Sequence, residues 1–132
     1  MRHPRLIEFD ATLKRLFDSV NDELEERYGD QYPLHPARPR HRETANRAHD
    51  GLFNVGASFT AGYGSRLGRG YVVQVDMVTL EQVPPAVRAG IEQEAVDLVE
   101  RKLPYYFPHR RLTVERDRHA FKIHGDLRLG EV

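Results

Sequence analysis

Two stretches of alternating apolar and polar residues, separated by a glycine- and arginine-rich loop, constrain the fold of this chain most strongly. Apolar side chains occupy every second position from Phe53 to Ala61 and again from Tyr71 to Met77. Alternation with a period of two is typical of β-strands that bury one face. The intervening residues, 62–70, carry Arg66 and Arg69 among four glycines. We therefore predict a β-hairpin whose mobile tip reaches towards a partner.

Two other segments have the three- and four-residue spacing of amphipathic helices. The first covers residues 6–28, and Gly29 supplies a natural helix stop. The second covers residues 85–103, begins in a proline pair that suits a first helical turn, and is expected to end before Pro104. Val87 and Ile91 are expected on its buried face.

A second hairpin is predicted from residues 112–115 and 120–124, with a polar turn between them. The predicted fold class is α+β: a two-layer sandwich in the order α-β-β-α-β-β, with two helices packed on one face of a mainly antiparallel four-stranded sheet. The other face is expected to be open and polar. Its outward positions are Asn54, Ser58, Gln74, Asp76, Thr113, Glu115, Lys122 and His124.

The length of 132 residues predicts a single domain, 1–132. Within it we distinguish an N-terminal helix (1–29), a flexible connection rich in proline and arginine (30–50) and a ββαββ core (51–132). Pro33, Pro36 and Pro39 prevent a helix in the connection. A connection of this length marks either a functional loop or a solvated linker.

Composition narrows the classes of function. Without cysteine, the chain has no disulfides, thiol nucleophiles or thiolate metal sites. No apolar run approaches the roughly 20 residues of a membrane helix, so we expect a cytoplasmic protein without a membrane partner. Twenty acidic residues balance twenty basic ones, but the acids concentrate in the helices and the arginines in the connections. Such a divided surface suits docking or self-association.

The candidate contact residues are arginines and glycines in the connections. A phosphate role is physically possible for the glycine loop, because glycines allow backbone amides to approach an anion. Its spacing matches neither the dinucleotide fingerprint nor the P-loop, so a flexible tip is the alternative. The predicted partner- or phosphate-binding residues are Arg38, Arg40, Arg42, Gly64, Arg66, Gly68, Arg69, Arg110 and Arg111.

The histidines give one candidate for acid-base chemistry. His35, His41 and His49 are widely spaced and match no metal-ligand pattern, so we expect no metal site and no cofactor. His124 projects from the open face, near Asp76 or Glu115 if their strands are neighbours. A carboxylate-oriented histidine there is a possible general base, and a cross-strand pair that only supports the sheet is the alternative.

These observations leave three hypotheses for function. The first is a non-catalytic binding domain that acts through protein contacts and self-associates, as a homodimer, by its hairpin tip, its connection and an open sheet edge. The second is an accessory domain whose arginines contact RNA or DNA phosphates, although the open face lacks stacking aromatics. The third is a small enzyme that uses His124 with a carboxylate. No nucleophile motif supports the third.

Overall fold

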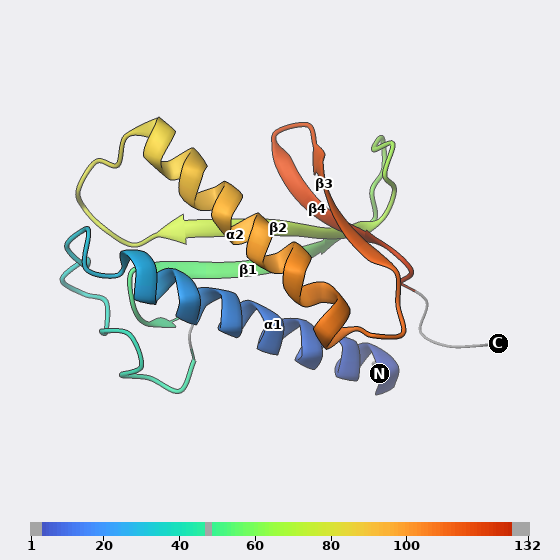
Figure 1. Ribbon diagram of the computed structural model, residues 1–132, viewed down its shortest axis with the longest axis horizontal. Helices are drawn as coiled ribbons and strands as arrows, with labels where there is room; N and C mark the ends of the chain where they lie inside the picture. The colour runs from blue at the N-terminus through green and yellow to red at the C-terminus, as the bar shows by residue number, and fades with distance from the viewer. Residues whose placement is uncertain (1–3, 47–48, 128–132) are drawn as a thin grey trace.

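The computed structural model describes residues 4–46 and 49–127 of the chain (Figure 1). Its elements are α1 (Pro4–Tyr28), β1 (Phe53–Thr60), β2 (Gly70–Met77), α2 (Pro85–Tyr106), β3 (Leu112–Asp117) and β4 (Ala120–Gly125). Both helices cover the same face of the sheet (Figure 1). The predicted element order and the two-layer α+β class are therefore confirmed.

The four strands form one antiparallel sheet in the order β1-β2-β4-β3. β1 pairs with β2 along its whole length, from Phe53 opposite Met77 to Thr60 opposite Gly70. The two hairpins join between β2 and β4, where Tyr71 lies opposite Ile123. β1 and β3 are thus the edge strands, and β1 is the edge beside α1 (Figure 1).

Helix α1 forms along the predicted apolar stripe and runs antiparallel to β1 (Figure 1). The buried residues of this stripe are Phe9, Leu13, Leu16, Phe17, Val20 and Leu24. The helix ends as predicted, because the amide of Gly29 donates to the carbonyl of Glu25 at 2.8 Å and the chain then turns away. Its exposed side is linked to α2, where Glu94 accepts hydrogen bonds from Arg27 and Tyr28.

Helix α2 differs from the prediction at both ends of its apolar face. It continues through Pro104 to Tyr106, beyond the predicted end at residue 103. Proline usually interrupts a helix, but here the amide of Phe107 closes the last turn on the carbonyl of Leu103 at 2.8 Å, and the Phe107 ring is buried. The predicted burial of Val87 is wrong, since this residue is 39% exposed.

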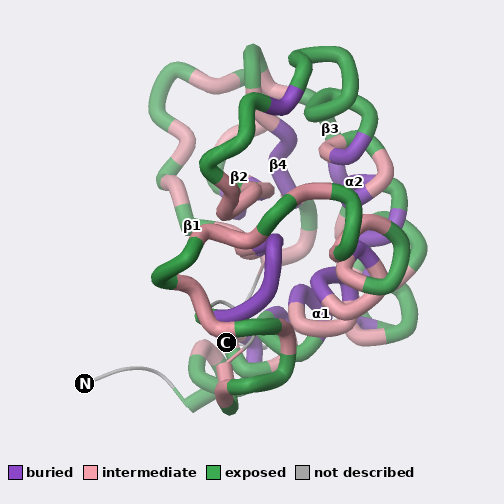
Figure 2. The backbone as a smooth tube through the Cα atoms, turned by 90° about the vertical axis from the view of Figure 1, so that its left-hand side faces the viewer, coloured by how far each residue is buried: buried purple, intermediate pink, exposed green. Residues whose placement is uncertain are grey.

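The core fills the space between the sheet and the two helices. Figure 2 shows buried backbone on β1, β4, α1 and α2, with exposed stretches in the connections. Phe53 and Ile123 enter the core from the sheet, and Leu16, Val20 and Val99 enter it from the helices. Each side chain of this size contributes about 1.5–3 kcal/mol when fully buried. The core therefore fixes α1 against β1, which sets the geometry of the site described next.

Candidate functional site

The structure divides the predicted arginines among three separate places. Arg38, Arg40 and Arg42 lie on the connection between α1 and β1, beside the start of β1. Arg66 lies near the tip of the glycine loop, 3.8 Å from Glu115 of β3. The third place is the opposite end of β1, where the glycine loop approaches the connection from α2 to β3; it holds Arg69, Arg110 and Arg111.

The first group is largely engaged within the molecule. The guanidinium of Arg38 donates to the carbonyls of Asp50 and Gly51, both at 3.0 Å, and to that of Phe53 at 3.3 Å. The Arg42 guanidinium lies 3.6 Å from Asp22 of α1, although its side chain is 61% exposed. Arg38 therefore fastens the connection to the start of β1.

The glycine loop lies against the sheet instead of projecting from it. Its anchor is Lys122 of β4, which the sequence placed on the open face and which is only 3% exposed. The Lys122 ammonium contacts Asp117 at 2.7 Å, the Ser65 hydroxyl at 2.9 Å and the Gly68 carbonyl at 2.8 Å. The prediction of an exposed Lys122 is wrong because the alternation of β4 fixes the face on which the side chain lies, but not what covers that face. We call these four residues the loop clamp.

The loop clamp has the residue types of a catalytic dyad but not the hydrogen-bond arrangement that one requires. Ser65 donates to Asp117 at 2.6 Å. The hydrogen bond from Lys122, followed by that from Ser65, holds the pKa of Asp117 below its ordinary value. Lys122 donates to the Ser65 hydroxyl at 2.9 Å, and that hydroxyl in turn donates to Asp117, so the hydroxyl proton is directed at the carboxylate and not at Lys122. The arrangement binds the loop to β4.

The backbone of the glycine loop also serves its own folding. Gly62, Gly64 and Gly68 have positive φ angles of 78°, 77° and 73°. The amide of Leu67 donates to the Ser65 hydroxyl at 3.1 Å, and the amide of Gly68 donates to the Ser65 carbonyl at 3.2 Å. Amides that close the turn in this way are not directed at an anion, so the geometry does not favour a phosphate cradle.

His124 forms a cross-strand contact of the kind expected from the sequence. Its Nε2 lies 3.1 Å from Thr113 Oγ1 and 3.4 Å from Glu115 Oε2, both on the neighbouring β3. Residues 4–46 and 49–127 contain no group of three or more histidine, aspartate and glutamate residues that is arranged to hold a metal ion. Because Arg66 also approaches Glu115, at 3.8 Å, the His124 contact belongs to a cluster of polar and charged side chains on this face of the sheet.

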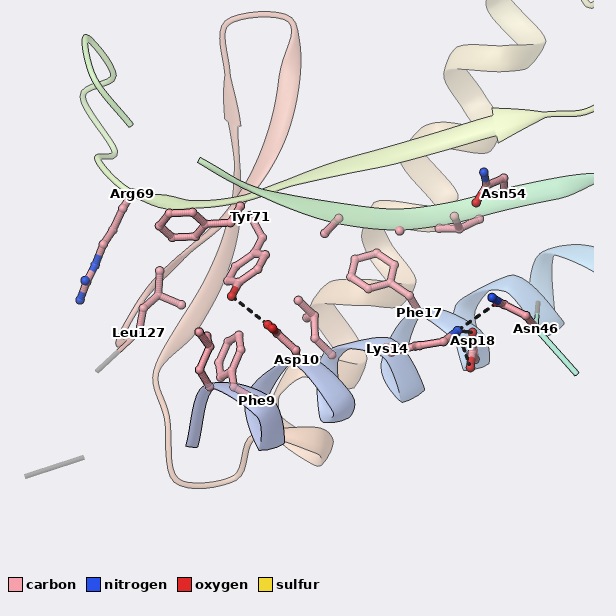
Figure 3. Close-up of a pocket in the computed structure, with 16 residues that line it drawn as sticks. Phe9, Asp10, Lys14, Phe17, Asp18, Asn46, Asn54, Arg69, Tyr71 and Leu127 are labelled. Carbon is pink, nitrogen blue, oxygen red and sulfur yellow. Dashed lines mark hydrogen bonds and ion pairs between the residues drawn. The ribbon is translucent and has the colours of Figure 1, made fainter. Parts of the chain in front are cut away.

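A groove of about 770 Å³ runs between α1 and the unpaired side of β1 (Figure 3). Its walls are apolar: α1 contributes Leu6, Phe9, Leu13 and Phe17, and the sheet contributes Val55, Ala57, Phe59 and Tyr71. Polar groups lie along its rim, where the Tyr71 hydroxyl donates to Asp10 at 3.2 Å and Lys14 contacts Asp18 at 3.2 Å (Figure 3). We call this feature the edge groove.

The backbone beside the edge groove has hydrogen-bonding groups directed away from the sheet. The amide of Val78 donates to the carbonyl of Leu52, which makes these two residues a hydrogen-bonded pair. Because such pairs alternate along an antiparallel ladder, the even-numbered residues of β1 are the ones whose amides and carbonyls bond to β2. The groups of Phe53 point outwards, where its amide donates to Glu25 Oε1 at 2.8 Å and its carbonyl accepts from Arg38. By the same alternation, outward-directed amides and carbonyls follow at Val55, Ala57 and Phe59. We call these three residues the free edge.

The start of β1 is closed, and the closure ends before the free edge begins. Burial raises the pKa of the Glu25 carboxyl above its ordinary value, although the amides of Phe53 and Leu52 donate to it. Together with Arg38, this carboxyl covers the first residue of β1. Beyond Phe53, and within residues 4–46 and 49–127, β1 pairs with β2 alone.

The edge groove opens at one end into a second, basic hollow of about 550 Å³. This basic cleft is lined by Arg69, His109, Arg111, Gly125, Asp126 and Leu127. Arg69 and Leu127 belong to both hollows, and Figure 3 shows them at the end of the groove near Tyr71. Arg110 is used differently, because its guanidinium lies over the Phe9 ring at 5.0 Å and donates to the Asp126 carbonyl at 3.2 Å.

The sequence predicted an open sheet edge as a contact element but did not identify the groove. Alternation identifies β1 as a strand, yet only the order β1-β2-β4-β3 shows that β1 is an edge. The width of the apolar stripe on α1 was the available signal, since Phe17 widens this stripe and also lines the groove. Of the predicted residues, Arg69 and Arg111 line this site.

Comparison with known proteins identifies a family without an assigned activity. Residues 4–125 match the model of a family that is described as "Uncharacterised protein". A relative from Borreliella burgdorferi (strain ATCC 35210), also described as an uncharacterized protein, is 36% identical over 118 residues, which cover 89% of this chain and 92% of the relative. No solved structure matches. In the described part of the chain, neither helix is long and apolar enough to cross a membrane.

Proposed function

We propose a function for this chain, which belongs to the family described as "Uncharacterised protein": it is a protein-binding domain that accepts a short extended segment of a partner as an additional strand on β1. The segment pairs with the free edge, and every second side chain enters the edge groove. The observation that carries this proposal is the position of an unpaired strand edge directly beside an apolar groove. Main-chain hydrogen bonds then supply affinity, and the groove supplies specificity.

The floor of the groove suits side chains that arrive at two-residue spacing. Val55, Ala57 and Phe59 point to the same side of β1, towards α1. Ala57 is small and lies between two larger residues, so it leaves a hollow for the side chain directly opposite. Phe59 is 59% exposed although it lines an apolar groove. A bound segment would cover this ring.

A slim segment fits this edge better than a second folded copy does. Helix α1 packs chiefly on β1 and α2. If two copies joined antiparallel through their β1 edges, the two α1 helices would approach each other to about the strand spacing of 4.8 Å. Packed helices are about 8–10 Å apart. A second copy of the chain, as expected from the sequence, is therefore the alternative partner for the β1 edge. The experiment below detects such a homodimer.

The arrangement offers less support for nucleic-acid binding. A track for a phosphate backbone requires basic residues gathered on one surface. Here Arg38 donates to backbone carbonyls, Arg66 lies near Glu115, and Arg69 lies at the far end of β1 from the first group. The edge of β1 therefore suits a protein segment better than a nucleic acid.

The test uses peptides selected from a random phage-display library. Peptides of about 12 residues are long enough to span the eight residues of β1. Binding of the selected peptides is measured by fluorescence anisotropy to the full chain, to Ala57→Leu and to Ser58→Leu. These two substitutions add the same side chain at adjacent positions of β1, but Ala57 faces the groove and Ser58 lies exposed on the opposite face.

We expect selected peptides to have apolar residues at alternate positions, and we expect Ala57→Leu to weaken their binding by roughly tenfold or more because it fills the hollow. Ser58→Leu should change binding by less than about twofold. Ala57→Pro, which removes an outward amide, should also weaken binding without unfolding the domain. The proposal fails if Ala57→Leu and Ser58→Leu bind equally well, or if sedimentation shows a wild-type dimer that Ala57→Leu dissociates.

A further inference from the structure

We infer that the partner segment carries an aspartate or glutamate next to its apolar positions, and that Arg69 and Arg111 bind this side-chain carboxylate in the basic cleft. The inference rests on the proposed function and adds the chemistry of the ligand and its placement along β1. It follows from the different character of the two ends of the edge groove.

At the end near the start of β1, charges are already paired. Lys14 contacts Asp18 at 3.2 Å and donates to Asn46 at 3.2 Å, and both contacts lie on the rim of the groove (Figure 3). A segment that passes this rim meets satisfied polar groups. This end therefore gives little electrostatic preference for the segment.

At the other end, the groove meets the basic cleft at Arg69, and Arg111 also lines that cleft; both arginines are exposed. Among the described residues, neither Arg69 nor Arg111 forms an ion pair, and both residues line the basic cleft with His109. Asp126 lies in the same cleft and takes part in contacts of its own: its amide donates to the Arg111 carbonyl at 3.0 Å and its carbonyl accepts from Arg110. The cleft thus presents two guanidinium groups to a strand that leaves the groove.

Carboxylates are the protein groups that suit this arrangement. Arginine presents a planar fork of donors that matches a carboxylate in two parallel hydrogen bonds. Arg69 belongs to both the groove and the cleft, so a residue just beyond the position opposite Phe59 meets it first. Because the arginines are exposed, the pairing should act in good part through the association rate and should weaken with salt.

A double-mutant cycle tests the inference. One partner of the cycle is a selected peptide or its analogue with the acidic residue changed to the amide (Glu→Gln or Asp→Asn). The other is the wild-type chain or the variant with both Arg69→Gln and Arg111→Gln. Arg66→Gln is the matched control, since Arg66 belongs to the same loop, is 74% exposed and approaches Glu115 on the other side of the sheet. Affinities are measured at about 0.05 M and about 0.5 M salt.

We expect the double variant to bind the acidic peptide roughly tenfold more weakly at low salt and the amide analogue less than about twofold more weakly, with the difference shrinking at high salt. Arg66→Gln should leave both affinities unchanged. Three results would each overturn the inference. The first is an equal loss of affinity for the two peptides, and the second is that the selected peptides carry no acidic residue. The third is a coupling that vanishes when the peptide's C-terminal carboxylate is amidated. In each of these cases, the proposed function still stands if Ala57→Leu weakens peptide binding. If Ala57→Leu leaves peptide binding unchanged, both the proposed function and the inference fail.

Discussion

Asp50 organises the connection between α1 and β1 from a fully buried position. Its Oδ2 accepts hydrogen bonds from the amide of Thr44 at 3.1 Å and from the Thr44 hydroxyl at 3.0 Å. Burial alone would raise the pKa of Asp50, but these bonds and one from the Arg42 amide lower it below its ordinary value. Arg42, in this connection, has a positive φ of 70°, which is uncommon for a residue other than glycine. One carboxylate therefore holds several residues of a segment that has little apolar content.

Replacing Asp50 with alanine should lower the free energy of unfolding by about 2–4 kcal/mol, because the Thr44 and Arg42 donors lose a buried acceptor. Urea denaturation followed by circular dichroism measures this loss. Glu43→Ala is the control on the same segment. Its carboxylate accepts from the Arg40 amide at 2.9 Å in an exposed position, so a change below about 1 kcal/mol is expected. Equal losses for the two variants would contradict the role assigned to Asp50.

At the scale of elements, the loop clamp determines where the glycine loop lies. It links the β1–β2 connection to β4 through Lys122 and to the end of β3 through Asp117. Arg118, in the turn between β3 and β4, adds a hydrogen bond to the Gly64 carbonyl at 3.2 Å. The two hairpins are thereby connected on the face of the sheet that the helices leave uncovered.

The clamp should make stability depend on pH below the ordinary pKa of aspartate. The pKa of Asp117 is lowered in the folded state, so its contribution is present above about pH 3.8 and is lost as the pH falls through the folded value. We expect Asp117→Asn to be less stable than the wild type at pH 7, with the difference shrinking as the pH falls below about 3.8. Thermal unfolding across this range measures the difference. A difference that stays constant down to pH 2 would show that the Asp117 charge does not stabilise the fold.

The elements themselves were predictable because each is encoded by a local period. The alternation of β1 and β2 and the stripe of α1 place these elements within a few residues of their observed ends. Pro104 was misleading because a buried Phe107 and its hydrogen bond to Leu103 maintain the last turn of α2. Local sequence does not encode such a contact.

The candidate site was less predictable because it depends on strand order and on loops that cross between hairpins. Lys122 is a polar residue at a polar-face position, and its burial arises from a loop more than fifty residues earlier in the chain. Arg38, Arg66 and Arg69 are the same residue type in loops of similar composition, yet their surroundings differ. Arg38 donates to backbone carbonyls, Arg66 lies near Glu115, and Arg69 lines the groove. Side-chain type gives a residue's chemistry, and only topology gives its neighbours.

At the scale of the whole molecule, the helices cover one face of the sheet, and the β1 edge stays open beyond Phe53 within the described residues. The helices bury the apolar face, and the loop clamp holds the glycine loop over part of the other. β1 is closed at Phe53 by Glu25 and Arg38, and beyond that residue it faces the edge groove. The proposed function therefore requires that the outward amides of β1 receive a partner strand.

Amide hydrogen exchange along β1, measured by NMR with and without a selected peptide, tests this claim most directly. In the free protein, the amides of Asn54, Gly56 and Ser58 should exchange slowly because they bond to β2, whereas those of Val55, Ala57 and Phe59 should exchange fast. On binding, the second set should become protected and the first set should stay unchanged. Protection that appears elsewhere, or equally at all six positions, would contradict strand addition at β1.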